Sequence, residues 1–206
     1  MFCLRKPTTN RMQRWLRTRA ELPVFTNEAN IPQTLPHGFR RNQGRRKLGS
    51  GETVYRASSE ALSRWQMFPH EWVTIEPREA RVETGQTVAV VARCLGVWAV
   101  NACQVVDVSE HVEDGVRRFG FTYATVGDHA VRGAERFEIV WDQHDDTVWY
   151  ELASYSRPRH WLVWLTLPYF RRVQRRFLRD SQSALLQSLR SSDGTEQFES
   201  ASGASK

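Results

Sequence analysis

Residues 117–141 read RRFGFTYATVGDHAVRGAERFEIVW, and this stretch decides the fold that we expect. In 119–125 every second residue is Phe, Tyr or Thr, and in 137–141 every second residue is Phe, Ile or Trp. That period is typical of strands with one buried face. The glycine-bounded loop 127–133 joins the two runs. We therefore predict a hairpin with an aromatic inner face.

Further strand-like runs extend this hairpin into a sheet. Residues 147–155 follow a polar turn and alternate in the same way. Upstream, the segments 71–76, 87–94 and 97–108 also read as strands. Together these runs, joined by short turns, predict an antiparallel meander of about six strands.

Two helices are predicted beside the sheet. Residues 54–65 follow a glycine turn and carry apolar residues at helical spacing. A longer helix is expected to start at about Pro158, with Pro168 breaking or kinking it. From Phe170 to Leu185 its apolar residues form one stripe, and arginines occupy the opposite face. The predicted fold class is therefore α+β, an antiparallel meander sheet wrapped on a long C-terminal helix.

The two ends of the chain read as poorly organised. Prolines and basic residues punctuate the N-terminal region, which predicts a loosely ordered basic arm over 1–34. The basic run 40–47 is expected to be solvated, with nucleic-acid binding as the less favoured alternative. From residue 191 onward Ser, Gly, Glu and Gln dominate, so 191–206 is predicted to be a disordered tail. Between these ends we expect a single domain, 35–190.

The composition suits one domain with an aromatic core. The 206 residues include 8 Trp and 10 Phe, and 40% are hydrophobic, which is too apolar for wholesale disorder. The net charge of +6 permits anionic partners without requiring them. The three cysteines have no CxxC or Cys/His spacing, so neither a disulfide framework nor a zinc site is indicated. We read no secretion signal and no transmembrane run, and we expect a cytoplasmic protein.

Polar residues around the central hairpin are candidates for ligand contact. Glu135 shares the parity of Phe137 and should face the interior, whereas Arg136 should point the other way. Tyr123 lies on the inner side of its strand, where its hydroxyl needs a partner; a core tyrosine bonded to backbone is an equal alternative. His129, in the glycine-bounded loop, is a candidate acid, base or ligand contact, or a solvated turn residue.

The remaining polar residues point to no reaction chemistry. Arg157, just before Pro158, is expected to anchor the corner between the last strand and the long helix, with gripping of an anion as the minor alternative. Ser154 and Ser156 have no GxSxG setting, and no paired carboxylates or metal-ligand spacings stand out. We therefore assign no catalytic residue, metal ligand or cofactor.

The chain resembles uncharacterised protein family 0548, a bacterial and plant domain of unknown function. Several ordered motifs carry the resemblance over about 35–189: KLGSG at 47–51, ALSRW at 61–65, FGFTYAT at 119–125, GDH at 127–129, GAERF at 133–137, YSRP at 155–158 and QRRF at 174–177. The chain has Ala134 where the family commonly has Glu and Asp128 where it commonly has Pro, so an acidic pair in that loop is not carried over. The resemblance implies a START-like or Bet v-like helix-grip fold, in which a sheet wraps a long C-terminal helix around an apolar cavity.

These expectations favour a binding module, a domain that binds or carries an apolar or amphipathic small molecule in a cavity between the sheet and the C-terminal helix. The candidate ligand contacts are Phe121, Tyr123, His129, Glu135, Phe137 and Arg157. An enzyme of the lyase, cyclase or hydrolase type, with His129 or Glu135 as base, is one alternative. Attachment to a membrane surface or a partner through residues 161–179, with a weak anionic contact, is the other. No nucleic-acid partner is expected.

Overall fold

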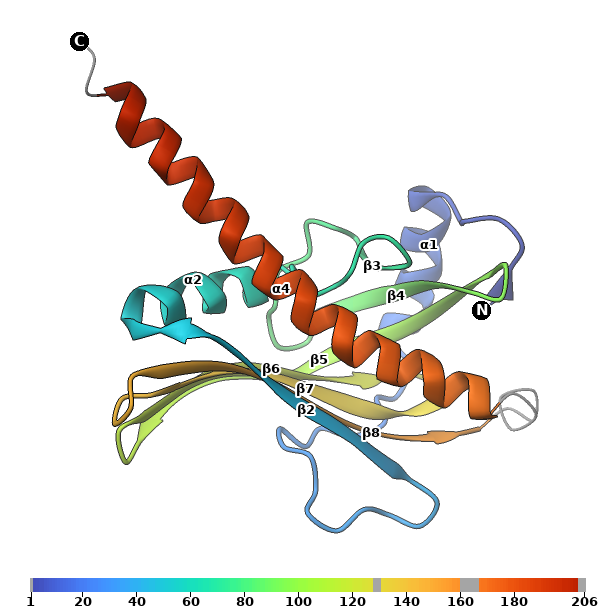
Figure 1. Cartoon of the computed structure of the whole chain (residues 1–206). Helices are drawn as coiled ribbons and strands as arrows, with labels where there is room; N and C mark the ends of the chain where they lie inside the picture. The colour runs from blue at the N-terminus through green and yellow to red at the C-terminus, as the bar shows by residue number, and fades with distance from the viewer. Residues whose placement is uncertain (1, 128–130, 160–166, 204–206) are drawn as a thin grey trace.

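The computed structural model describes residues 2–127, 131–159 and 167–203, with side chains described as far as residue 191. Its elements in chain order are β1 (Phe2–Cys3), α1 (Thr9–Ala20), β2 (Arg40–Ser50), α2 (Gly51–Ser63), β3 (Val73–Glu76), β4 (Thr87–Cys94), β5 (Val97–Glu113), β6 (Val116–Thr125), β7 (Val131–Asp142), β8 (Thr147–Pro158) and α4 (Leu167–Gly203). Figure 1 shows a curved sheet with α4 lying across its concave side. The α+β class, with an antiparallel sheet packed on a long C-terminal helix, is confirmed.

Within the described residues the sheet has eight strands. Its order is β2-β8-β7-β6-β5-β4-β3, with β1 paired to β5, and the paired strands are antiparallel. Strands β3 to β8 follow one another as the predicted meander, and the N-terminal region adds β1 and β2. Across β6 and β7, Phe121 lies opposite Phe137 and Tyr123 lies opposite Glu135. The predicted central hairpin is therefore present, with its aromatic face on the inner side.

Strand β2 corrects the expectation that the basic run 40–47 lies in a loosely organised region, although its side chains are mostly solvated as predicted. It pairs with β8 from Arg40 opposite Ser156 to Ser50 opposite Thr147. Without β2, the edge of β8 would leave a long row of backbone N–H and C=O groups unpaired. Most side chains of β2 are exposed, and their positive charge at the new sheet edge discourages pairing with a further strand.

Helix α4 starts later and ends later than expected. Strand β8 continues through Pro158, and the helix begins at Leu167. Pro168 lies in the first turn of α4, where a missing N–H breaks no intrahelical bond, and residues 160–166 before it lie outside the described part of the chain. The helix continues to Gly203, whereas a disordered tail was expected over 191–206. In the part of the chain that is described, none of the helices is both long and apolar enough to cross a bilayer.

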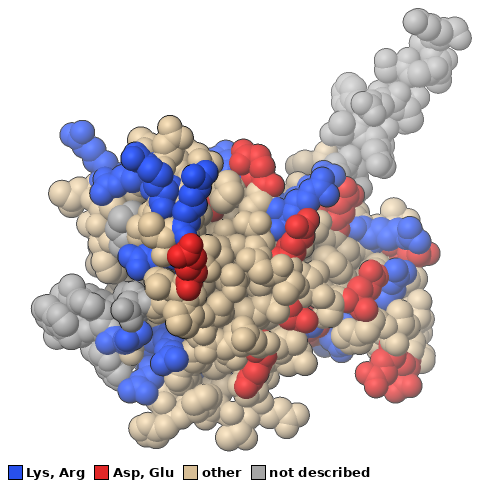
Figure 2. Space-filling model, turned by 180° about the vertical axis from the view of Figure 1, so that it is seen from behind, with Lys and Arg blue, Asp and Glu red and all other residues tan. Residues whose placement is uncertain are grey.

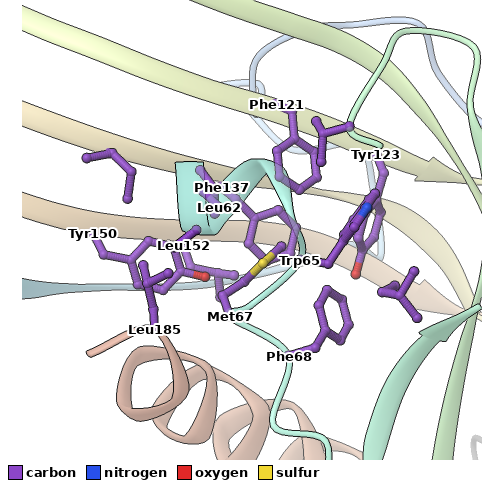
Figure 3. Packing of buried hydrophobic residues seen from close by; sticks show 14 of the residues in the cluster. Leu62, Trp65, Met67, Phe68, Phe121, Tyr123, Phe137, Tyr150, Leu152 and Leu185 are labelled. Carbon is purple, nitrogen blue, oxygen red and sulfur yellow. The ribbon is translucent and has the colours of Figure 1, made fainter. Parts of the chain in front are cut away.

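The inner core lies between the concave face of the sheet, α2 and α4. Trp65 and Phe68, which follow α2, are buried there with Phe121 and Phe137 of the sheet. The rings of Phe121 and Phe137 stack with centroids 5.0 Å apart, and Trp65 meets Phe121 edge-on at 4.9 Å. Leu185 closes the core from the side of α4 (Figure 3). Eight of the 23 buried residues of this cluster are aromatic, so the core is less aromatic than the composition predicted, although its centre is a group of packed rings.

The N-terminal region covers the outer face of the sheet, which corrects the expectation of a loosely ordered arm. Met12 and Leu16 of α1 are buried against outer side chains of β4 and β5. Further along, Phe25 and Phe39 stack 5.4 Å apart, and both contact Tyr155 of β8. The physical reason is that these strands carry apolar residues on both faces, so the outer face also needs cover. Figure 2 shows the molecule from this side, with basic side chains gathered over α1.

Candidate functional site

Tyr123 of β6 and Glu135 of β7 form a hydrogen-bonded pair on the concave face of the sheet. The two residues lie opposite each other in register, and the Tyr123 hydroxyl donates to Glu135 Oε2 over 2.7 Å. Both share the inward parity of Phe121 and Phe137. Strand alternation puts the two side chains on the same face, and the register of the hairpin brings them into contact.

Burial dominates the electrostatics of this pair. It raises the pKa of Glu135, and the hydrogen bond from Tyr123 offsets only part of that rise. The pKa of Tyr123 is raised well above its ordinary value, first by burial and then by the charge of Glu135. Tyr123 therefore remains a neutral donor, and Glu135 holds a proton more readily than an exposed glutamate does.

The Glu135 side chain is surrounded by protein but is not fully buried. Protein surrounds its carboxyl group, yet the side chain keeps part of its surface accessible, whereas Tyr123 is only 5% exposed. Its second oxygen, Oε1, accepts no hydrogen bond from the residues that the structure describes. The Glu135 carboxyl group therefore keeps hydrogen-bonding capacity that the described residues do not use.

Aromatic rings form the walls around the pair. The Trp65 ring lies nearly parallel to that of Tyr123 with centroids 6.4 Å apart, and Phe137 lies 5.4 Å from Tyr123 (Figure 3). Trp65 reaches this position from a left-handed backbone conformation, φ 61°, and its indole N–H donates to the carbonyl of Ala80 over 2.9 Å. Such a conformation persists in a bulky residue only where the surroundings hold it. Phe121, a predicted contact like Phe137, is fully buried and supports this wall.

Two further inner-face features were not found by sequence reasoning. The Cys103 thiol is buried, and its pKa is raised by burial and by the nearby Glu135 carboxylate. The Tyr150 hydroxyl and the Ser181 hydroxyl lie 2.8 Å apart and join β8 to α4. The cysteine was considered only as a disulfide or metal residue, although its shared parity with Val105 signals an inward position. The contact between Tyr150 and Ser181 has no local signal.

Arg157 lies away from this pair. Its side chain is exposed on the outer face, against Gly38, so the structure does not bring it together with Tyr123 and Glu135. The preceding residue, Ser156, faces inward and accepts a hydrogen bond from Gln174 of α4, so alternation turns Arg157 outward. His129 lies outside the described residues, as do 160–166 of the segment expected for attachment.

Arg136, the residue after Glu135, faces the outer side as its parity predicted. It is 7% exposed. Its guanidinium donates five hydrogen bonds, to the carbonyl of Ala29 and to the side chains of Asp107, Ser109, Thr122 and Glu138. Of the three guanidinium nitrogens of Arg136, only Nε has no hydrogen-bond partner among the described residues. Because Ala29 belongs to the N-terminal region, this network fastens that region to the sheet.

The pair can exchange a proton and make directed hydrogen bonds. Within the described parts of the chain, no three His, Cys, Asp or Glu side chains are arranged to hold a metal ion. The chemistry available at the pair is that of the Glu135 carboxyl group and the Tyr123 hydroxyl, with the Cys103 thiol and the Tyr150 hydroxyl nearby among aromatic rings.

A family model described as a domain of unknown function, DUF1990, matches residues 25–184. The chain belongs to this family. Curated relatives carry the name UPF0548 protein, as the sequence motifs predicted. The relative from Arabidopsis thaliana is 34% identical over 157 residues, which cover 75% of this chain and 76% of the relative. The relative from Dictyostelium discoideum is 28% identical over 207 residues, which cover 92% of this chain and 96% of the relative.

Solved structures show a general likeness to this member of the family. A hypothetical protein from Helicobacter pylori has a TM-score of 0.48 at 9% sequence identity, covering 79% of this chain and 96% of its own. Truncated norcoclaurine synthase from Thalictrum flavum has a TM-score of 0.44 at 9% identity, covering 76% of this chain and 97% of its own.

Proposed function

We propose that the chain binds an apolar or amphipathic small molecule between the concave face of the sheet and α4, with the polar end of the molecule at Tyr123 and Glu135. The observation that carries the proposal is the Glu135 carboxyl group, which is enclosed, partly accessible and bonded through one oxygen. Ligand sites of this type combine apolar walls with a few convergent polar groups. A cytoplasmic location is part of the proposal.

The chemistry of the pair restricts the polar end of the ligand. Tyr123 already donates to Glu135 Oε2, so Oε1 is the atom that faces a ligand. A ligand hydroxyl or amine can donate to Oε1, whereas a ligand carboxylate would be repelled by an ionised Glu135. The rings of Trp65 and Phe137 beside the pair suit an aromatic or aliphatic body.

Catalysis at the same pair is the second candidate, and the pKa of Glu135 favours it. A carboxyl group whose pKa is raised by burial accepts a proton closer to neutral pH, as a general base must. Tyr123 beside it supplies a neutral donor. A lyase, cyclase or hydrolase of this kind would release a bound molecule chemically changed, whereas a carrier would release it intact.

Native mass spectrometry of the protein purified from the cells that produce it tests the proposal, followed by denaturing release to identify the bound molecule. We expect a stoichiometric small molecule with a donor group at one end. Glu135→Gln and Tyr123→Phe should each lower its occupancy. Incubating the released molecule with fresh protein then distinguishes a carrier from an enzyme.

Tyr55→Phe is the matched control. Tyr55 is also a buried tyrosine whose hydroxyl donates to a carboxylate, that of Glu110 over 3.3 Å, but it lies on α2 against Trp141. In Tyr55→Phe, the fraction of protein that carries the bound molecule should equal that of the unaltered protein. A molecule retained equally by all three variants would contradict the assigned position, and a protein without any bound molecule would contradict stable carriage.

A further inference from the structure

A second hollow lies outside the core, between the start of β2 and the first turns of α4. Figure 1 shows these two starts at the same end of the molecule. The hollow has a volume of about 500 Å³. It is lined by Arg40, Arg41 and Asn42 of β2 and by Leu167, Pro168, Arg171, Gln174 and Arg175 of α4. We call it the arginine groove.

Four arginine residues line the arginine groove, and none of the described residues that line it carries a carboxylate. In the described chain, none of the four forms an ion pair. Arginines elsewhere do form such pairs, for example Arg45 with Glu151 and Arg176 with Asp180. Like charges gathered without a counter-charge repel one another, and a bound anion relieves that repulsion. The groove therefore differs from an ordinary charged surface, where the two signs alternate.

Hydrogen bonds fix the walls of the groove. The Asn42 side chain donates to the backbone carbonyl of Gln174 over 3.4 Å, which ties the edge strand to the helix. Gln174 in turn donates to Ser156 of β8 over 2.8 Å. Arg41 alternates with Arg40 and Asn42 along β2, and its guanidinium donates to the carbonyls of Pro32 and Gln33. The guanidinium groups that remain for the groove are those of Arg40, Arg171 and Arg175. A site with preset walls loses less conformational freedom when it binds a ligand.

The first turn of α4 adds to the positive potential, because the N-terminus of a helix carries a partial positive charge and free N–H groups. Planar guanidinium groups match the oxygens of a phosphate group with two parallel hydrogen bonds. We propose that the arginine groove binds the phosphate group of a phosphate ester or phospholipid headgroup. This inference rests on the groove alone and is independent of the ligand proposed for the inner face.

The test compares two double variants that remove the same charge from the same helix. Arg171→Gln with Arg175→Gln removes both positive charges that α4 contributes to the groove. Arg172→Gln with Arg179→Gln removes two charges from residues that do not line the groove. Arg172, Arg175 and Arg179 are exposed and Arg171 is half-buried, so both variants should fold, which circular dichroism and thermal unfolding check. The probes are inorganic pyrophosphate in titration calorimetry and phosphatidylcholine vesicles, with and without phosphatidic acid, in co-sedimentation.

We expect the groove variant to bind at least roughly ten-fold more weakly than the unaltered protein, and the control variant to bind equally well. Binding of pyrophosphate with this pattern shows that a soluble phosphate group is sufficient for binding, which favours a soluble phosphate ester as the ligand. The same pattern only with phosphatidic acid vesicles identifies a lipid headgroup. Equal weakening in both double variants, or no binding of either probe, would overturn the proposal. Neither result changes the occupancy expected at Glu135.

Discussion

Glu135 and Arg136 are consecutive residues of β7 that lie on opposite faces of the sheet, and they differ in how many hydrogen bonds they make. On the outer face, Arg136 donates five hydrogen bonds that reach the N-terminal region, β5, β6 and β7. On the inner face, Glu135 has one bond, from Tyr123, and keeps accessible surface. A buried charge with many partners holds a structure together, whereas a buried group with spare capacity leaves a place for a ligand. The hydrogen bonds of Arg136 on the outer face thus stabilise the packing of the N-terminal region on the sheet.

The largest expected effect comes from breaking the outer network with Arg136→Met. Met makes no such hydrogen bonds, so Asp107 and Glu138 lose their buried counter-charge. We expect the free energy of unfolding in urea to fall by about 3–5 kcal/mol, and amide exchange around Ala29 to accelerate. Arg132→Met, at an exposed position of the same strand, should cost no more than about 1 kcal/mol. Equal losses in the two variants would show that the network adds nothing.

A somewhat smaller effect is expected from Met12→Ala, which tests whether α1 is part of the outer face. Met12 is 1% exposed, so its truncation leaves a cavity against β4 and β5. The free energy of unfolding should fall by about 2–5 kcal/mol. Gln13→Ala, at the exposed neighbouring position, should change little. If the N-terminal arm were loosely ordered, the two variants would unfold at the same urea concentration.

The smallest effect is expected at the inner face, as a change in pH dependence. The folded pKa of Glu135 lies above its ordinary value of 4.5 because of burial, so folding favours its protonated form. Its contribution to stability is therefore fully present below that ordinary value and is lost as pH rises through the folded pKa. In Glu135→Gln, the free energy of unfolding should fall less over this window, as measured by urea unfolding at a series of pH values.

Glu151→Gln is the control for this series, because Glu151 lies on the outer face with its side chain 34% exposed, paired to Arg45. The slope should change more in Glu135→Gln than in this control. An identical slope in Glu135→Gln and the unaltered protein would refute the view that burial governs the Glu135 carboxyl group, and would weaken the contrast between the two faces.

Most of the meander could be predicted from the sequence because the alternation of a strand is visible within a few consecutive residues. The period of two in 119–125 and 137–141 was enough to predict the hairpin, its aromatic face and the opposite directions of Glu135 and Arg136. Strand β2 was not predicted because five of its eleven residues are basic and its partner, β8, lies about a hundred residues further along the chain. The outward direction of Arg157 follows from the same alternation along β8.

The sequence by itself determined which side chains share a face, since backbone geometry repeats every two residues in a strand and every 3.6 in a helix. Only the tertiary structure decided which of them meet. The register of β6 on β7 joins Tyr123 to Glu135, and the folding of the N-terminal region brings Ala29 to Arg136, 107 residues away. The arginine groove arises in the same way, from two segments that no local pattern connects. Contacts of this kind depend on packing the whole chain, and no window of sequence contains them.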